Sequence, residues 1–381
     1  MRVIYFIDDK MGGIASLNDN LIRNKNADEQ TVILIDKKES TYTHNTIQFK
    51  AGEVIHFRYS DEENFYRVIK RLRKLVPDQE GAIIMNDIVE MQMLDHFPVK
   101  FTTYQLVHDE YNFQLALRYA HIVDIFIAHS HHFYEQLLAA LPQRKEQLFY
   151  LPHGVAVPVQ YRQPSAEKQP VKLLFLGRMN SKKGIFDLPV IAGWLQQWNI
   201  PYQFTCIGNG PELPALKDAW KNDPHVGFLS PDSNEEVIKL CAAHDIYVLP
   251  TKFEGSPVAL LETMSTGLVP VVTDLPGGIR EIVTEDIGFR ITEGDNRGFA
   301  EKIALLSNDR ERLNRLSMNA RNKIMEQFDV KKTSAAYHHL FDGYARFFKT
   351  KQLQKRKIGS RLDQPFMPSY VTSLLRKTIK K

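Results

Sequence analysis

Three cations in the second half of the sequence gather where a strand is expected to turn into a helix. Arg178, Lys182 and Lys183 follow the apolar run Val171-Lys-Leu-Leu-Phe-Leu, which predicts a buried strand. The helix is expected to begin near Gly184. Positive side chains at a helix N-terminus are unfavourable unless an anion is bound there. The cluster therefore predicts a site for a diphosphate.

A second strand, loop and helix are predicted farther along the chain. The apolar run from Tyr247 indicates a buried strand that ends near Pro250. Ser256 is a good helix N-cap, Pro257 suits the first helical position, and Gly267 stands where the helix should stop. Free backbone N–H groups and the helix dipole at such a start favour a bound anion.

Two glutamates belong to this second segment. Glu254 is in the loop, and Glu262 lies about a turn and a half inside the helix, away from its apolar face. A carboxylate would repel an anion at this loop, so we expect both glutamates to accept hydrogen bonds from hydroxyl groups. Phosphates and hydroxyls together indicate a nucleotide sugar. The alternative is a capped helix with two solvated glutamates, because Glu is common on exposed helix faces.

The residues from Glu254 to Gly278 closely resemble the signature of glycosyltransferase family 4, whose members are retaining GT-B enzymes. The matching features are Glu-x7-Glu with Gly-Ser-Pro after the first Glu, the run Thr263-Met-Ser-Thr-Gly-Leu-Val-Pro-Val-Val-Thr, and Gly277-Gly278. The resemblance implies an α/β GT-B fold, in which two Rossmann-like domains face each other across a cleft. It also implies a nucleoside-diphosphate sugar as donor, with UDP or GDP as its nucleotide.

The resemblance also implies roles for the charged residues. Arg178 and Lys183 match a Gly-Arg…Lys-Gly motif that holds the two phosphates, whereas Lys182 is expected to be a solvated neighbour. Glu262 should bind the ribose hydroxyls, and Glu254 should lie beside the hydroxyls of the donor sugar. The catalytic set is therefore expected to include Glu254 and both cations.

Glycine-rich turns are expected to line the donor site. Gly208 and Gly210 match a Gly-x-Gly-Pro-Glu turn of the family, and Gly255-Ser256-Pro257 forms the loop before the second helix. Gly12 and Gly13 follow the first predicted strand, where the family has a loop that meets the donor. Each could be only a tight turn, and the absence of Gly-x-Gly-x-x-Gly weakens a dinucleotide interpretation.

The first half of the chain alternates short apolar runs with helical stretches, which is typical of a parallel sheet covered by helices. Strands are expected at 3–7, 31–35, 82–85, 102–106, 122–128 and 147–150, and a basic helix at 61–75. The cations of that helix complement its dipole, although a membrane-facing patch is an alternative.

His108 and Asp109 follow the strand at 102–106, at the edge where open α/β sheets place their ligands. The family resemblance implies that His108 orients the acceptor or the transferred sugar. His129, His131 and His132 also end a strand, but three such closely spaced positions cannot all face one ion, so we expect no metal there.

The chain is expected to divide into an acceptor-binding Rossmann-like domain at 1–165 and a nucleotide-sugar-binding one at 170–330, joined by a polar linker at 160–169. An amphipathic helix is predicted at 298–328. A second helix at 331–348 should cross back to the first domain, as is common in this fold, and 349–381 is a basic tail.

The net charge of +4 conceals an asymmetry between the tail and the remaining chain. Residues 349–381 contain ten Lys or Arg and one acidic residue, Asp363, a balance of +9, which leaves −5 for the rest. The tail could be a solvated extension or could contact an anionic membrane surface. Nucleic-acid binding is a weaker alternative, and we expect no nucleic-acid partner.

Composition points to a cytoplasmic location, with the inner face of the cell membrane as a further option. The sequence has no run of about 18 apolar residues that could span a membrane. The N-terminus turns acidic too soon for a signal peptide. Cys206 and Cys241 both stand in apolar settings, so buried reduced thiols are expected.

The expected reaction is transfer of a sugar to a hydroxyl of a glycan or lipid-linked acceptor, with retention at the anomeric carbon. The sequence has no Asp-x-Asp motif that could hold a metal, so fixed cations and the helix dipole would stabilise the leaving diphosphate without a cofactor. Bacterial surface-polysaccharide or lipopolysaccharide assembly is the usual setting of the family. A nucleotide-sugar epimerase of the same fold and a non-catalytic sugar-nucleotide-binding protein are the alternatives.

Overall fold

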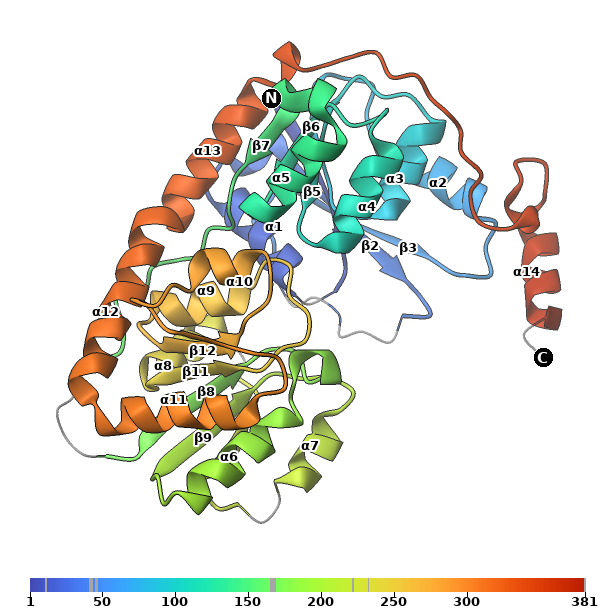
Figure 1. The fold of residues 1–381 in the computed structure, drawn as a ribbon. Coiled ribbons are helices and arrows are strands. Elements are labelled where there is room, and N and C mark those ends of the chain that lie inside the picture. The colour runs from blue at the N-terminus through green and yellow to red at the C-terminus, as the bar shows by residue number, and fades with distance from the viewer. Residues whose placement is uncertain are drawn as a thin grey trace. The chain divides into compact units, whose positions relative to one another are not determined.

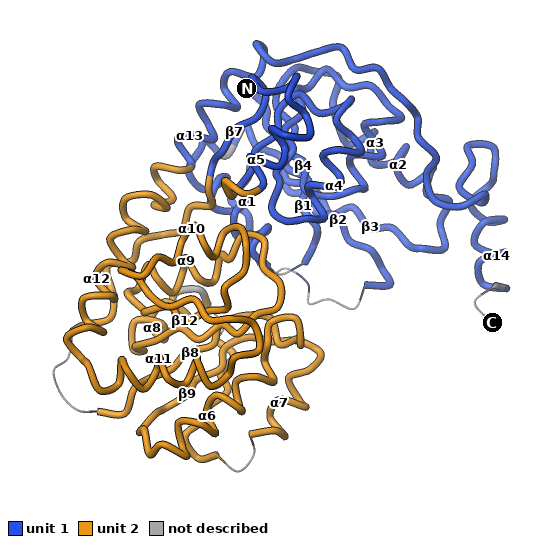
Figure 2. The backbone as a smooth tube through the Cα atoms, viewed as in Figure 1, with its two compact units in different colours: residues 1–129, 133–151, 334–381 blue, residues 130–132, 152–333 orange. Residues whose placement is uncertain are grey.

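The chain forms two compact units, which Figure 2 colours separately. The computed structural model describes residues 1–10, 12–40, 44, 47–164, 169–220, 223–231 and 233–379. Unit 1 comprises Met1–His129, Phe133–Leu151 and Ser334–Lys381, and unit 2 comprises Ser130–His132 and Pro152–Thr333. Part of the predicted linker, 165–168, lies outside the described residues.

Unit 1 is built on a parallel sheet. Its strands are β1 (Arg2–Asp8), β2 (Gln30–Lys37), β3 (Glu53–Tyr59), β4 (Gly81–Met85), β5 (Thr102–Val107), β6 (Ile125–Ala128) and β7 (Leu148–Tyr150). Their order in the sheet is β3-β2-β1-β4-β5-β6-β7, so the direction in which strands are added reverses between β1 and β4 (Figure 1).

Helices cover both faces of this sheet. They are α1 (Gly13–Arg23), α2 (Phe65–Arg73), α3 (Ile88–His96), α4 (Glu110–Tyr119), α5 (His131–Ala140) and α13 (Val330–Asp342), with short 3-10 turns η1 (Ala27–Glu29), η2 (Pro142–Gln147), η4 (Tyr344–Arg346) and η5 (Arg361–Asp363). The helix α14 (Ser369–Ile379) lies against the residues that precede α2. Although Tyr337 and Phe341 of α13 follow all of unit 2 in sequence, they are part of the core of unit 1. The Tyr104 hydroxyl of β5 donates to the Leu340 carbonyl at 3.0 Å.

Unit 2 repeats the same plan. Its strands are β8 (Val171–Leu176), β9 (Tyr202–Ile207), β10 (Val226–Leu229), β11 (Ile246–Leu249), β12 (Val269–Thr273) and β13 (Phe289–Ile291), in the order β10-β9-β8-β11-β12-β13. Its helices are α6 (Asp187–Gln197), α7 (Leu213–Ala219), α8 (Asn234–Ala242), α9 (Val258–Ser265), α10 (Gly278–Ile282), α11 (Asn296–Asn308) and α12 (Arg310–Gln327), with the 3-10 turn η3 (Ser181–Lys183).

The central strands read as near-continuous apolar runs because parallel sheets are buried on both faces. All described residues of β4, β5, β6, β11 and β12 are buried. The predicted α/β class with parallel sheets is confirmed, and each strand predicted in the first half is present, with its ends shifted by a few residues.

Other elements differ from the sequence expectation. The strand β3 was not predicted, because it lies at the sheet edge and most of its side chains are not buried. The helix predicted at 61–75 begins only at Phe65, since the Asn64 side chain caps it. The single helix predicted at 298–328 is two helices. They are separated at Asp309, whose side chain accepts from the Arg312 backbone N–H at 2.9 Å and so starts α12.

The described part of the basic tail packs on unit 1. Lys351 Nζ forms an ion pair with Asp124 at 2.7 Å, and both side chains are almost fully buried. Asp363, which is also buried, accepts from the Phe65 backbone N–H at 2.7 Å and pairs with Arg376 at 2.7 Å. One carboxylate thus joins the start of α2, the turn η5 and the helix α14.

Replacing Asp363 by Ala should release the end of the tail. The change removes the partner of Arg376 and leaves the N–H of Phe65 without its acceptor, and breaking a buried ion pair typically costs about 3–5 kcal/mol. We expect trypsin to cleave the variant between Lys355 and Arg376 faster than the wild-type chain.

Asp78→Ala is the matched control, since Asp78 also pairs with an arginine, Arg73, but is largely exposed. Equal resistance of both variants to trypsin would show that Asp363 does not hold the tail.

Candidate functional site

The charged residues predicted to bind the donor lie at the point where the strand order of unit 2 reverses. Strand β8 pairs with β9 on one side and with β11 on the other. The loop after β8 carries Arg178 and Lys183, and the loop after β11 carries Glu254. Open α/β sheets bind ligands at such a switch point, outside the carboxyl ends of the strands.

An ion pair links the two loops. Lys183 Nζ donates to the Glu254 carboxylate, and the two side chains are 25% and 11% exposed, so both are partly shielded from solvent. The backbone adds a second link, because Lys252 N–H donates to the Lys182 carbonyl at 2.9 Å. The Thr251 hydroxyl donates to the same carbonyl at 3.1 Å. Residues predicted to act together are therefore brought into contact.

The backbone after β8 differs from the predicted helix start at Gly184. Lys182 and Lys183 lie in η3, where the Asn180 side chain accepts from Lys183 N–H at 3.2 Å, and α6 begins only at Asp187. Gly184 has a left-handed φ of 67°, and a Cβ there would lie 1.8 Å from the Pro250 carbonyl oxygen. The sequence argument that cations oppose a helix dipole was therefore wrong in its geometry. The glycine instead allows the two loops to approach each other.

Arg178 and Lys182 are both exposed on this loop. The backbone beside Arg178 is fixed, since Met179 N–H donates to the Asn209 carbonyl at 2.9 Å. The backbone that carries Arg178 is therefore held by a hydrogen bond. The Lys182 side chain extends from the turn η3, and the Lys182 carbonyl accepts hydrogen bonds from the loop after β11.

The turn with Gly208 and Gly210 packs against the loop after β8. A Cβ at Gly208 would lie 2.0 Å from the Gly177 carbonyl oxygen, and one at Gly210 would lie 2.3 Å from that of Met179. Close backbone packing thus explains both glycines before any ligand is considered. Their expected place in a nucleotide pocket stays a prediction.

The helix α9 begins one residue later than expected. Pro257 occupies the N-cap position with no side-chain cap hydrogen bond, and the first helical residue is Val258, so Ser256 is not the N-cap. The other end is as predicted. Gly267, with φ of 87°, donates to the Met264 carbonyl at 2.9 Å, and the next residue, Leu268, donates to that of Thr263 at 3.2 Å, which is a Schellman motif.

A neighbouring turn supports the loop before α9. A Cβ at Gly278 would lie 2.9 Å from Pro257 and 3.0 Å from the Gly255 carbonyl oxygen, so only a glycine fits without displacing the loop. This contact accounts for a glycine at position 278 beside the loop that leads into α9.

Glu262 lies on α9 with its side chain partly accessible, while its neighbours Leu260, Leu261 and Met264 are buried. Protein atoms surround the carboxyl closely enough that burial raises its pKa to about 7. The charges of Glu254 and Glu262 both act to raise the pKa of the buried Tyr247 hydroxyl, after the larger effect of its burial. Both carboxylates therefore lie near the end of β11.

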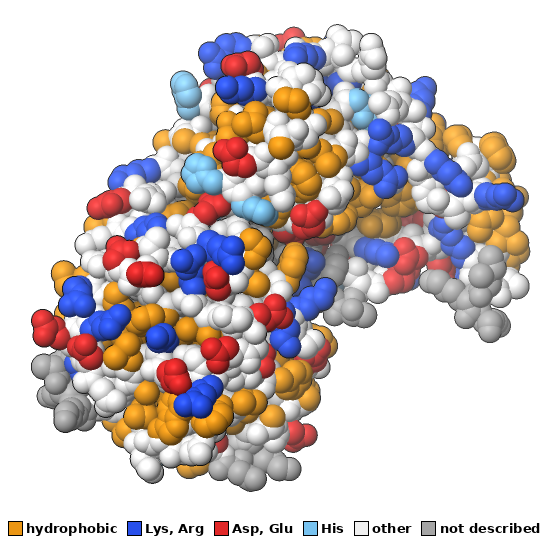
Figure 3. All heavy atoms as spheres, in the orientation of Figure 1, with side chains coloured by type: hydrophobic (Ala, Val, Ile, Leu, Met, Phe, Trp, Pro, Cys, Tyr) orange, Lys and Arg blue, Asp and Glu red, His pale blue; other side chains and the backbone are white. Residues whose placement is uncertain are grey.

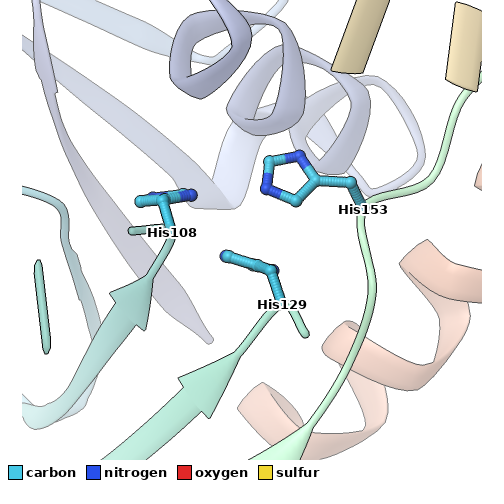
Figure 4. Close-up of side chains that lie close together, drawn as sticks. All are labelled: His108, His129 and His153. Carbon is cyan, nitrogen blue, oxygen red and sulfur yellow. The ribbon is translucent and has the colours of Figure 1, made fainter. Parts of the chain in front are cut away.

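In unit 1, His108 follows β5 as predicted. The ring is buried, its Nε2 lies 3.0 Å from the Asn86 side-chain oxygen, and it stacks on His129 at a centroid distance of 4.5 Å (Figure 4). Burial and the neighbouring His129 hold the pKa of His108 well below its usual value. The sequence argument grouped His129 with His131 and His132 and missed its pairing with His108.

Asp109 and Gly12 play structural parts in the same unit. Asp109 caps α4 by accepting from Asn112 N–H at 3.0 Å. Gly12 is the N-cap of α1, and Gly13 is its first residue. Met11, which precedes them, lies outside the described residues.

Sequence reasoning also missed a group of acidic residues at the ends of β1 and β4. Burial and the adjacent Asp87 raise the pKa of Asp8 to about 8. The Tyr111 hydroxyl donates to Asp87 at 2.7 Å, and the buried Glu90 accepts from the backbone N–H groups of Asn86 and Asp87. The signal was available, because Asp8 directly follows the strand predicted at 3–7 and Asp87 is the second residue after the one predicted at 82–85.

Comparison with known proteins agrees with the geometry of unit 2. The family model described as "Glycosyl transferases group 1" matches residues 159–323. Residues 159–323 are a group 1 glycosyl transferase domain. This segment holds Arg178, Lys183, Glu254 and Glu262, the four charged residues predicted to bind the donor.

Curated relatives match the same part of the chain. The putative colanic acid biosynthesis glycosyltransferase WcaL of Escherichia coli K12 is 28% identical over 179 residues, 44% of each chain. The UDP-Gal:alpha-D-GlcNAc-diphosphoundecaprenol alpha-1,3-galactosyltransferase of Escherichia coli is 31% identical over 131 residues, 34% of each chain. The chain thus spans less than half the length of the curated relatives it matches.

Solved structures show the fold over most of the chain. Anabaena Alr3699/HepE, solved in complex with UDP and glucose, has a TM-score of 0.73 at 17% identity and covers 90% of this chain and 100% of its own. Sucrose-phosphate synthase of Thermosynechococcus elongatus has a TM-score of 0.72 at 16% identity, covering 90% and 99%. The fold is GT-B, with two Rossmann-like domains.

Glu262 should make the stability of the protein pH-dependent. Since its folded-state pKa of about 7 exceeds the ordinary 4.5, the folded chain holds this proton more tightly than the unfolded chain. The ionised carboxyl therefore costs stability, at most roughly 3 kcal/mol above pH 7 and nothing below the ordinary pKa. In Glu262→Gln the melting temperature should fall less than in the wild type between pH 5 and pH 8, because the folded-state pKa of about 7 lies inside this range.

Glu285→Gln, at an exposed glutamate of the same unit, is the control and should follow the wild-type profile. Identical profiles for Glu262→Gln and the wild type would show that the Glu262 carboxyl is not destabilised on folding.

Proposed function

We propose that the protein is a retaining glycosyltransferase that moves a hexose from a UDP- or GDP-linked donor to a hydroxyl of a glycan or lipid-linked acceptor. The observation that carries the proposal is the contact between Lys183 and Glu254 at the switch point of unit 2. It joins a cation suited to a diphosphate with a carboxylate suited to sugar hydroxyls. Arg178 on the same loop supplies a second cation.

The donor would bind with its diphosphate at the loop after β8 and at the start of α9. Arg178 and Lys183 would neutralise the phosphates, and the first N–H groups of α9, which have no side-chain cap, would add hydrogen bonds. Glu262, four residues into that helix, would accept from the ribose hydroxyls. Gly208 and Gly210 would let the backbone pass close to the nucleotide.

In the reaction, the bond between the anomeric carbon and the diphosphate oxygen breaks, and a bond to the acceptor oxygen forms on the same face of the sugar. The acceptor proton passes to the departing phosphate oxygen. Negative charge develops on the diphosphate, where Arg178 and Lys183 are fixed in advance, so no metal is required. Glu254 favours the positive charge that develops on the sugar ring.

His108 would orient the acceptor or the transferred sugar. Because burial keeps its ring neutral, one ring nitrogen can donate and the other can accept a hydrogen bond at neutral pH. The hydrogen bond with Asn86 fixes the position of the ring. A neutral ring held in place is better suited to orienting a bound sugar than to carrying a positive charge.

The relatives support a setting in bacterial surface-polysaccharide synthesis. One is named for colanic acid biosynthesis and another for a diphosphoundecaprenol-linked acceptor. We therefore propose that the protein acts on such acceptors in the cytoplasm, at the inner face of the cell membrane. We further propose that the basic tail contacts anionic lipid and that the protein has no nucleic-acid partner.

Nucleotide binding tests the donor site. With EDTA present, one of UDP, GDP and ADP should raise the melting temperature of the wild type by a few degrees, because a ligand that binds only the folded state stabilises it. Arg178→Ala should weaken that nucleotide about tenfold or more, since hydrogen bonds to charged groups contribute about 1.5–3 kcal/mol.

Lys182→Ala is the matched control, an exposed cation of the same loop that should leave the shift intact. Failure of all three nucleotides to stabilise a folded wild type would overturn the donor-site assignment.

Turnover tests the chemistry. With the donor sugar identified by its nucleotide, product formed in the presence of EDTA should keep the donor's anomeric configuration by NMR, and Glu254→Ala should lower kcat by about a hundredfold or more. An inverted product would contradict the proposed same-face attack, and activity that requires an added metal would contradict the role given to the two cations.

A further inference from the structure

The C-terminal helix α14 has an unusual distribution of polar and apolar side chains. A helix on a protein surface normally buries its apolar face and exposes its polar one. Here Tyr370 and Leu374 are 77% and 66% exposed, Leu375 is 40% exposed, and Phe366 in the preceding turn is 77% exposed. We call these four residues the apolar face of the tail.

The opposite side of α14 is polar and holds the helix to unit 1. The Thr372 hydroxyl donates to the Leu362 carbonyl at 2.9 Å, and Ser373 donates to Glu62 at 3.3 Å. Arg376 donates to the carbonyls of Asp61 and Glu63 at 2.6 Å each. These hydrogen bonds hold the polar side of α14 against unit 1. The apolar face is therefore directed outward by specific contacts of the helix.

A second anchor lies just before the helix. The Asn64 side-chain amide donates to three backbone carbonyls of the tail, those of Leu362, Gln364 and Met367, at 2.9–3.1 Å. Asn64 is fully buried and also caps α2. The turn that carries Phe366 is thereby fixed to the start of α2.

The charge around the apolar face is mainly positive. The single acidic residue of 349–381, Asp363, is buried and paired, so it adds no negative charge at the surface. Eight exposed cations lie on the tail and on the adjoining helix α2, namely Lys355, Lys357, Arg361, Lys377, Arg67, Lys70, Arg71 and Lys74. Two of them are paired, Lys377 with Glu62 and Arg71 with Glu63, so the cations outnumber the acidic side chains that neutralise them. Figure 3 shows hydrophobic side chains next to Lys and Arg side chains over this part of unit 1.

We infer that α14 and the turn before it dock on an anionic lipid bilayer, with Phe366, Tyr370 and Leu374 entering the interface and the surrounding cations meeting the lipid phosphates. Apolar and aromatic side chains flanked by Lys and Arg are the composition that binds such an interface. At 11 residues the helix is too short to span a membrane, and no helix in the described part of the chain is long and apolar enough to do so. It would lie along the surface.

The surrounding charge favours lipid over a second copy of the chain. Two copies that met through this face would bring their exposed cations together, whereas anionic lipid neutralises them. The inference names a partner for the enzyme of the proposed function, yet it depends on the tail alone and not on the donor site.

Vesicle sedimentation of the full chain tests the inference. Wild-type protein should pellet with phosphatidylcholine vesicles that contain phosphatidylglycerol and stay in solution with pure phosphatidylcholine, and added salt should weaken binding. Phe366→Ser/Leu374→Ser should weaken binding by about tenfold or more, because each change removes a large apolar side chain from the interface.

Val159→Ser is the matched control, because Val159 is an exposed apolar residue of unit 2 and should not affect binding. Tyr370→Trp gives a local signal: its fluorescence, taken as the difference from the wild type, should shift to the blue with anionic vesicles.

Any of four results would overturn the inference. The first two are no pelleting of the wild type with anionic vesicles and equal pelleting of the double variant. The others are a double variant that alters only the oligomeric state and binding of RNA in place of vesicles. Nucleotide stabilisation, measured on the same variants, should be unchanged, so a failure of the donor-site assignment can be distinguished from a failure of membrane docking.

Discussion

Close approach of two loops at the switch point of unit 2 is the constraint on which the candidate site depends. Gly184 fits against the Pro250 carbonyl only because it has no side chain, and the backbone of Lys252 then bonds to that of Lys182. The ion pair of Lys183 and Glu254 forms across this contact. The backbone contact that the glycine allows thus places the two charged side chains close together. Their mutual attraction then stabilises this contact.

Much of the fold could be predicted because buried parallel strands can be recognised in the sequence as apolar runs. The elements that it missed lack such runs: β3 is a half-exposed edge strand, and the break at Asp309 depends on one side-chain cap. Helix starts were the weakest point. Ser256 is a better N-cap than Pro257 by propensity, yet α9 begins after Pro257, in a loop that packs closely against Gly278.

The candidate site was predicted in part from charge and spacing. The strand-loop-helix order predicted that four charged residues would share one edge of a sheet, namely Arg178, Lys183, Glu254 and Glu262. Contacts that join distant segments could not be read in this way. The stacking of His108 on His129 and the pairing of Asp8 with Asp87 depend on which strands are neighbours. The inward polar side of α14 depends on the carbonyls of Asp61 and Glu63, which lie 315 and 313 residues before Arg376 in the chain.

The return of α13 to unit 1 has a consequence for the order in which the protein folds during synthesis. Unit 2 is almost continuous in sequence, so it can fold as soon as Pro152–Thr333 has left the ribosome. Unit 1 begins first but lacks Tyr337 and Phe341 of its core until all of unit 2 has been translated. The first domain to be made is therefore the last to be completed, and a chain that stops early exposes the unfilled core of unit 1 beside a finished unit 2.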